Sequence, residues 1–185
     1  MKEENLPQKQ KKIHVGKECA YLAVFVALVI AAQLCLSAVA GVEVVTVLFA
    51  SFAFVFGKGR GMLAATAFSL LRQLVFGFFP QVLVLYLLYY NAFAFLFGAL
   101  GESMEEPLKK LWLIVLSACV STLLFSALDV VINSLWYAYS WGAVKVYALA
   151  SLPVAATQTA CAAVSVGALF MPLHRAFSLA KKRLS

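Results

Sequence analysis

The sequence predicts an all-α membrane protein, a bundle of six transmembrane helices whose N- and C-termini both lie in the cytoplasm. Hydrophobic residues make up 64% of the 185 residues and charged residues only 12%, whereas a soluble domain is roughly half apolar and a quarter charged. A helix that crosses about 30 Å of hydrocarbon needs about 20 mostly apolar residues, and uncharged runs fill most of the chain. The composition therefore excludes a water-soluble fold.

Charged turns and prolines divide these apolar runs into separate helices. The first three helices are expected at residues 18–41, 42–57 and 61–78. The second helix is short, and a glycine-rich basic turn, residues 57–61, follows it. Proline cannot continue the hydrogen-bond ladder of a helix, so Pro80 separates the third helix from the fourth.

The second half of the chain contains three further apolar runs. The last three helices are expected at residues 81–100, 107–137 and 145–177. Ser103 and Pro107 have the composition of a helix start, with a capping residue followed by proline in the first turn, so the fifth helix is expected to begin at Pro107. Pro153 is expected to bend the sixth.

The basic residues predict the orientation. If the N-terminus is inside, all 15 lysines and arginines except Lys145 and Arg72 fall on the cytoplasmic side, as the positive-inside rule requires. The bundle, residues 17–180, then lies between a polar tail, residues 1–16, and a basic tail, residues 181–185. The net charge of +7 follows from this topology, with attraction to anionic lipid of the bilayer as a by-product, and requires no nucleic-acid partner.

The cysteines and histidines predict neither a metal site nor a disulfide framework. The four cysteines lie singly in apolar segments without CxxC spacing, and each of the two histidines lacks a second ligand nearby in the sequence. We therefore expect no metal and no cofactor.

With this topology, most intramembrane polar residues fall at one depth, in the outer half of the bundle. An isolated charge at mid-membrane costs at least about 2.5–3.5 kcal/mol and usually faces a partner or a wet cavity, so Arg72 is expected to pair with Asp129 or Glu43. Two interpretations are open. One is a buried ion pair that only fixes helix packing, and the other is an outward-facing cavity that binds a small, planar, partly charged solute.

In the second interpretation, Arg72 would bind a carboxylate or carbonyl of the solute, Asp129 or Glu43 an amine or ring N–H, and aromatic rings would stack on it. The candidate substrate-binding residues are Glu43, Arg72, Gln73, Tyr86, Tyr90, Asn91, Asp129, Asn133, Trp136 and Gln158. Trp136 is equally typical of the aromatic belt at a membrane interface. Gln158 either completes the cavity or bonds to a neighbouring helix.

A stripe of small residues marks the first helix. Ala23, Ala27 and Ala31 recur every four residues, a spacing that lets another helix approach closely. Residues Gly61, Ala65 and Ser69 repeat it in the third helix. Such a stripe is either a docking face for a partner or a contact inside the bundle.

Several local motifs accompany this architecture. Residues 23–27 follow an AxxxA pattern, residues 56–61 form a glycine-rich turn, and residues 97–101 end the fourth helix between two glycines. Together with six helices, a short second helix and cytoplasmic termini, these features resemble the substrate-binding S components of energy-coupling factor (ECF) transporters. The resemblance extends over nearly the whole chain and implies the plasma membrane of a bacterium.

The resemblance implies a mechanism that this chain cannot perform alone. An S component captures a vitamin or similar micronutrient from outside and docks on a coupling transmembrane component, and two cytoplasmic ATPase subunits drive the complex. By this resemblance the stripe Ala23, Ala27 and Ala31 would dock on the coupling component. The outer cavity would hold the substrate beneath the loops that follow the first and fifth helices. The sequence has no GxxxxGK[ST] loop, so ATP would be hydrolysed on the partner subunits.

Three other classes of protein are alternatives to this interpretation. An intramembrane enzyme is disfavoured because the sequence contains neither HExxH nor GxSxG, and we do not expect this chain to be an enzyme. A structural or assembly membrane protein of similar topology, or a small secondary transporter that works as a dimer, stays open. The sequence also leaves open the substrate, among riboflavin, thiamine, folate, biotin, a nucleobase-like compound or an amino acid.

Overall fold

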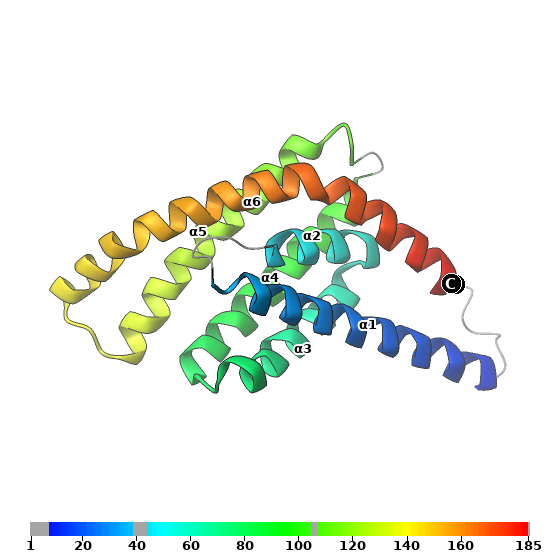
Figure 1. Cartoon of the computed structure of the whole chain (residues 1–185), viewed down its shortest axis with the longest axis horizontal. Helices are drawn as coiled ribbons and strands as arrows, with labels where there is room; N and C mark the ends of the chain where they lie inside the picture. Colours follow the sequence, from blue (N-terminus) through cyan, green and yellow to red (C-terminus); the bar gives the residue numbers. More distant parts are fainter. Residues whose placement is uncertain (1–7, 39–43, 105–106, 185) are drawn as a thin grey trace.

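The computed structural model describes residues 8–38, 44–104 and 107–184, and this part of the chain is all-helical, with six helices and no strand (Figure 1). The helices are α1 Gln8–Leu36, α2 Val45–Phe56, α3 Lys58–Phe76, α4 Pro80–Ser103, α5 Leu111–Trp136 and α6 Trp141–Leu184. The all-α class predicted from the sequence is confirmed.

Four segments are long and apolar enough to cross a membrane. They are Gly16–Leu36, Pro80–Ser103, Leu111–Trp136 and Trp141–Arg183. Large apolar side chains also cover the outside of the bundle, where Leu74 is 82% and Leu135 78% exposed. Apolar surface of this kind marks a contact with membrane or protein, so the structure has the character of a membrane protein.

Helix α2 forms the centre of the bundle. All 12 of its residues are buried, and it packs against α3, α4 and α6. Its Phe49 meets the ring of Phe68 on α3 and of Tyr90 on α4, with centroids 5.2 and 5.1 Å apart. On the other side, Phe54 packs edge-on against Phe170 of α6 at 5.3 Å. Burial of these rings supplies most of the packing of the core, because large aromatic side chains bury the most area.

Two glycines of α4 allow it to touch the backbone of α2 and the turn that follows. A Cβ atom at Gly101 would lie 2.0 Å from the carbonyl oxygen of Phe54, and one at Gly98 would lie 2.5 Å from the amide nitrogen of Lys58. The turn itself requires Gly57, whose φ of +86° is unfavourable for other residues. The α2–α3 turn is therefore held against α4 by backbone contact.

The helix boundaries differ from those predicted at several places. Helix α3 begins at Lys58, so residues 58–61 of the expected turn are helical. Helix α1 already begins at Gln8, because lysine and glutamine are good helix formers and extend the helix into the segment expected as a tail. Helix α5 begins at Leu111 after a turn at residues 107–110, not at Pro107. Ser103 does not cap it, because this serine ends α4 and its hydroxyl donates to Ala99 O at 2.9 Å.

Helix α6 is longer than predicted and includes residues expected as a loop and as a basic tail. Its 44 residues continue through Pro153 and Pro172 and give a length of about 66 Å. Membrane helices tolerate such prolines because neighbouring groups satisfy the freed backbone. Figure 1 shows α6 curving along the whole bundle above α2.

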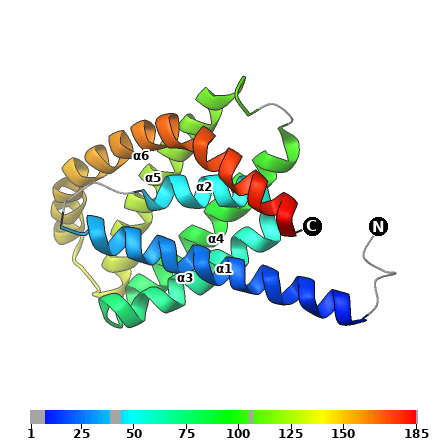
Figure 2. The same ribbon diagram turned by 45° about the vertical axis from the view of Figure 1, so that its right-hand side comes forward.

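The two ends of the bundle differ in chemistry. At one end, Lys58 pairs with Glu102 at 2.7 Å and Arg60 pairs with Glu18. We call this the basic end. The N-terminal part of α1 and the C-terminus of α6 lie on the same side of the molecule in Figures 1 and 2. At the opposite end, which we call the aromatic end, Gln81 donates to the hydroxyl of Tyr137 at 2.9 Å, and Tyr137 stacks on Tyr139.

The glycine contact predicts a sharp difference between two alanine substitutions. Gly101→Ala should destabilise the protein by about 1–3 kcal/mol, because the added methyl group overpacks a backbone contact. Gly59→Ala is the matched control, since a Cβ there meets nothing within 4 Å and alanine is the better helix former. Thermal unfolding in detergent should show a lower Tm for the first variant only. Equal Tm values would contradict the close approach of α2 and α4.

Candidate substrate site

Three helices bring polar side chains together around Arg72. The Arg72 Nε on α3 donates to Gln33 Oε1 on α1 at 3.1 Å, and Gln33 Nε2 donates to the hydroxyl of Tyr86 on α4 at 3.2 Å. The guanidinium carbon also lies 4.6 Å from the ring centroid of Phe76 and 4.3 Å from that of Tyr86. We call Gln33, Arg72, Phe76 and Tyr86 the arginine cluster.

The arginine cluster contains a cation but no carboxylate. Of the two expected partners, Asp129 makes no ion pair with Arg72, and Glu43 lies outside the described residues. Neither terminal nitrogen of Arg72 has a hydrogen-bond partner among the residues that the structure describes. A guanidinium held by an amide and two ring faces can therefore still bind a carboxylate through both terminal nitrogens.

A second polar group, the aspartate cluster, joins α5 to α6. The hydroxyl of Tyr147 donates to Asp129 Oδ2 at 2.7 Å, and Asn133 Nδ2 donates to Asp129 Oδ1 and to the Asp129 carbonyl, each at 2.9 Å. Hydrogen bonds to an ionised carboxylate are stronger than those between neutral groups. Both oxygens of Asp129 are thus satisfied within the protein, unlike the terminal nitrogens of Arg72.

Aromatic rings lie between the two clusters. Tyr86 of the arginine cluster meets Phe125 of α5 edge-on, with centroids 5.9 Å apart, and Phe125 precedes Asp129 by one helical turn. On the other side of the aspartate cluster, Tyr147 meets Tyr139 at 6.1 Å. The contact between α4 and α5 therefore connects the two clusters, because Tyr86 of the arginine cluster lies on α4 and Asp129 of the aspartate cluster lies on α5.

Two of the predicted amide residues serve the bundle itself. Asn91 joins α4 to α3, because its Oδ1 accepts from Thr66 at 3.1 Å while its Nδ2 donates to Leu87 O at 2.8 Å. Gln73 is buried, and its Oε1 accepts from the amide of Phe79 at 3.3 Å. Its Nε2 has no hydrogen-bond partner within the part of the chain that the structure describes, so a buried amide NH2 group in the α3–α4 connection is unpaired there.

The remaining predicted residues are dispersed. Tyr90 lies in the core between Phe49 and Phe68, Trp136 is 52% exposed at the end of α5, and Gln158 is half-buried on α6. The structure thus brings together Arg72 with Tyr86, and Asp129 with Asn133. Tyr90 borders the arginine cluster through its ring contact with Tyr86, whereas Trp136 and Gln158 lie outside both clusters.

Sequence reasoning missed Gln33 and Tyr147. Gln33 is the sole amide in the first apolar run, and burying an amide without a partner costs free energy, so this residue could have been found by the same argument that singled out Arg72. Tyr147 carried no comparable signal, because it lies near the expected start of a helix, where tyrosine is common at a membrane interface.

The alanine stripe of α1 is not covered by the bundle. Ala23, Ala27 and Ala31 are all exposed, whereas Phe25 and Val29 on the other face of α1 are buried. The corresponding stripe on α3 is buried. Within the described residues, the α3 stripe serves internal packing and the α1 stripe stays free for another contact.

No protein-family model, curated protein or solved structure matches this chain. The class that the fold defines is an all-α bundle with four helices of membrane-spanning length and composition. Two polar clusters lie within it, one centred on Arg72 and the other on Asp129.

The aspartate cluster predicts energetic coupling between α5 and α6. A double-mutant cycle of Asp129→Asn and Tyr147→Phe should give a coupling energy on the order of 1 kcal/mol, because each change removes the same charge-assisted hydrogen bond. The measurement is the free energy of unfolding in detergent. Tyr137→Phe removes another hydroxyl at the aromatic end, and its effect should simply add to that of Asp129→Asn. Additive effects for Tyr147→Phe as well would contradict the bond.

Proposed function

We propose that this chain is the substrate-binding S component of an ECF-type importer, which captures a vitamin-like micronutrient from outside for ATP-driven uptake. The observation that carries the proposal is Arg72. Its guanidinium lies among apolar helices, is held by the neutral Gln33 and two rings, and has no ion pair among the described residues. A cation in such surroundings needs a counter-charge or water, and an anionic substrate would supply the charge.

The proposal includes a topology of six membrane segments with both termini in the cytoplasm. The ion pairs Arg60–Glu18 and Lys58–Glu102 gather charge at the basic end, and the positive-inside rule assigns that end to the cytoplasm. Helix α2 would be about 18 Å long and would cross only part of the hydrocarbon. Its complete burial supports a position inside the bundle, where protein and not lipid surrounds its ends.

Under this topology the arginine cluster lies in the outer half and faces incoming solute. A planar substrate could stack on Tyr86 or Phe76 while its carboxylate or carbonyl binds Arg72. An amine or ring N–H could exchange for the Tyr147 hydroxyl at Asp129. Vitamins such as folate and biotin carry a carboxylate and N–H groups of this kind.

The exposed stripe of α1 supports the docking half of the proposal. Because Ala23, Ala27 and Ala31 face outward, another helix could approach the backbone of α1 closely. The coupling transmembrane component would dock there, and two ATPase subunits would hydrolyse ATP on its cytoplasmic side. This chain would then be a binding subunit and not an enzyme.

Arg72→Ala should lower substrate affinity about 10- to 100-fold, because a hydrogen bond to a charged group contributes about 1.5–3 kcal/mol. The purified protein is incubated with riboflavin, thiamine, folate and biotin in parallel, and native mass spectrometry measures the retained compound. Lys145→Ala, which removes an exposed cation near the aromatic end, is the matched control and should bind as the wild type does. If Arg72→Ala changes only the Tm, Arg72 is structural and an assembly protein becomes the better proposal.

Ala27→Leu should weaken association with the coupling component at least tenfold, because a bulky residue at the centre of a small-residue stripe prevents close helix approach. Ala160→Leu makes the same change on an exposed position of α6 and should leave the complex intact. Co-purification after co-expression with the coupling component and both ATPases measures the association. Substrate binding should be equal in both variants. A complex that tolerates leucine at position 27 would rule out this docking face, and uptake without ATPases would favour a secondary transporter.

A further inference from the structure

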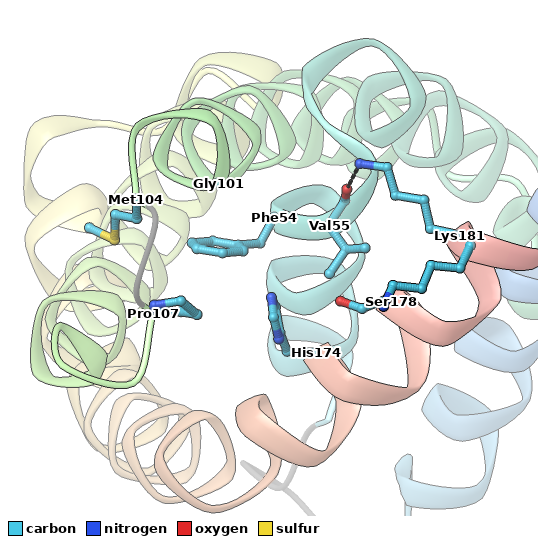
Figure 3. Close-up of a pocket in the computed structure, with 9 residues that line it drawn as sticks. Phe54, Val55, Gly101, Met104, Pro107, His174, Ser178 and Lys181 are labelled. Atoms are coloured by element: carbon cyan, nitrogen blue, oxygen red, sulfur yellow. Dashed lines mark hydrogen bonds between the residues drawn. The ribbon is translucent and has the colours of Figure 1, made fainter. Parts of the chain in front are cut away.

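A cavity at the basic end is separate from both polar clusters. Its volume is about 440 Å³, and it opens between the C-terminal ends of α2, α4 and α6 and the turn before α5 (Figure 3). It shares no residue with the arginine or aspartate cluster. The volume lies in the range of roughly 300–1,000 Å³ that small-molecule sites occupy.

One side of the cavity is cationic. The Lys181 ammonium at the end of α6 donates to the carbonyl oxygen of Val55 in the last turn of α2, and this bond holds its charge beside the cavity. Lys182 and Ser178 line the same side. An ammonium carries more than one donor, so Lys181 can bond to Val55 and to a ligand at once.

The other side of the cavity is apolar. Figure 3 shows the ring of Phe54 between Met104 and Pro107 on one side and His174 on the other. His174 meets Phe54 edge-on, with ring centroids 5.7 Å apart. The cavity therefore combines lysine and hydroxyl donors with an aromatic and thioether wall, which suits a ligand that has an anionic group and an apolar body.

The position of the cavity indicates which class of ligand it would bind. It lies where the apolar run of α6 gives way to Lys181, Lys182 and Arg183, and Leu179 beside these lysines is 63% exposed. Apolar residues followed at once by lysines are typical of the boundary between hydrocarbon and headgroups, and basic pockets between helices bind anionic headgroups there.

We propose that this cavity binds the phosphate headgroup of an anionic phospholipid, with Lys181, Lys182 and Ser178 on the phosphate and Phe54 and Met104 beside the glycerol and upper acyl chains. The site would anchor the ends of α2 and α6 to the membrane surface. This inference does not depend on the importer proposal, since it concerns different residues at the opposite end of the bundle.

The test measures lipid retention by the delipidated full chain in detergent. Palmitoyl-oleoyl phosphatidylglycerol and palmitoyl-oleoyl phosphatidylcholine are added separately, and native mass spectrometry gives the bound fraction. The wild type should retain phosphatidylglycerol and release phosphatidylcholine. The Lys181→Gln/Lys182→Gln variant should lose phosphatidylglycerol affinity on the order of tenfold or more, since each lysine near a headgroup contributes about fivefold.

The matched control removes the same charge from the same helix outside the cavity. Arg175→Gln/Arg183→Gln changes two exposed cations that do not line it and should retain phosphatidylglycerol within about twofold of the wild type. Equal losses in both double variants would overturn the proposal in favour of general surface charge. Because Lys181 also bonds to α2, the Ser178→Ala/Lys182→Gln variant, which keeps that bond, is measured as well. It should also lose affinity, and retention equal to that of the wild type would contradict the proposal.

Two further measurements test whether the phosphate group belongs to a soluble compound and whether acidic residues near the cavity in the sequence take part in binding. Glycerol 3-phosphate at millimolar concentration should not displace the lipid, and displacement would assign the cavity to a soluble phosphate ester. Glu105 and Glu106 follow Met104 in the sequence and lie outside the described residues. The Glu105→Gln/Glu106→Gln variant should retain at least as much phosphatidylglycerol as the wild type, and a loss would contradict an anion site.

Discussion

The buried helix α2 is the constraint on which the rest of the structure depends. It is too short to span a membrane alone, and all its side chains are buried, so the other helices must enclose it. Phe49 fixes the positions of Phe68 and Tyr90, and both of these rings contact Tyr86. Tyr86 in turn carries the guanidinium of Arg72 on its ring face. The arginine cluster is therefore built directly on the aromatic core around α2.

The two polar clusters differ in how completely the protein satisfies them. Asp129 accepts hydrogen bonds on both carboxylate oxygens, so a ligand cation would have to displace Tyr147 or Asn133. Arg72 uses its Nε on Gln33 and keeps its terminal nitrogens unbonded within the described residues. Among the described residues, no acidic side chain therefore competes with an anion for Arg72. Under the proposed function, this asymmetry would favour a substrate that binds through a carboxylate or carbonyl. The aspartate cluster would connect α5 to α6 until a donor group of the substrate replaced the Tyr147 hydroxyl.

Sequence reasoning succeeded where the determining interactions are local. Apolar runs predicted the six helices, and Asp129 and Asn133 are four residues apart, a spacing that places both on one face of a helix. It did not find Gln33 as a partner of Arg72, because the depth of a residue in the membrane can be inferred from its position along a helix, but the rotation of the helix about its axis cannot. The start of α5 was misplaced for a related reason, since the hydroxyl of Ser103 bonds backward to Ala99 within α4. The basic-end cavity forms where the ends of α2, α4 and α6 and the turn before α5 meet in space, and no local sequence pattern predicts such a meeting.

Helix α1 connects the two halves of the proposed function. Its buried face contacts the core through Phe25, which stacks on Phe52 of α2 at 3.9 Å, while Ala31 on its outer face is exposed. Gln33, less than one turn beyond Ala31, holds Arg72. A ligand that binds Arg72 would therefore act on a residue that is hydrogen-bonded to α1, and α1 is also the helix that carries the alanine stripe. Helix α1 packs less extensively against the bundle than α2 does, and glycine contacts hold α2 on α4. Under the proposed function, an altered bond between Gln33 and Arg72 would therefore change the position of α1 more readily than that of α2.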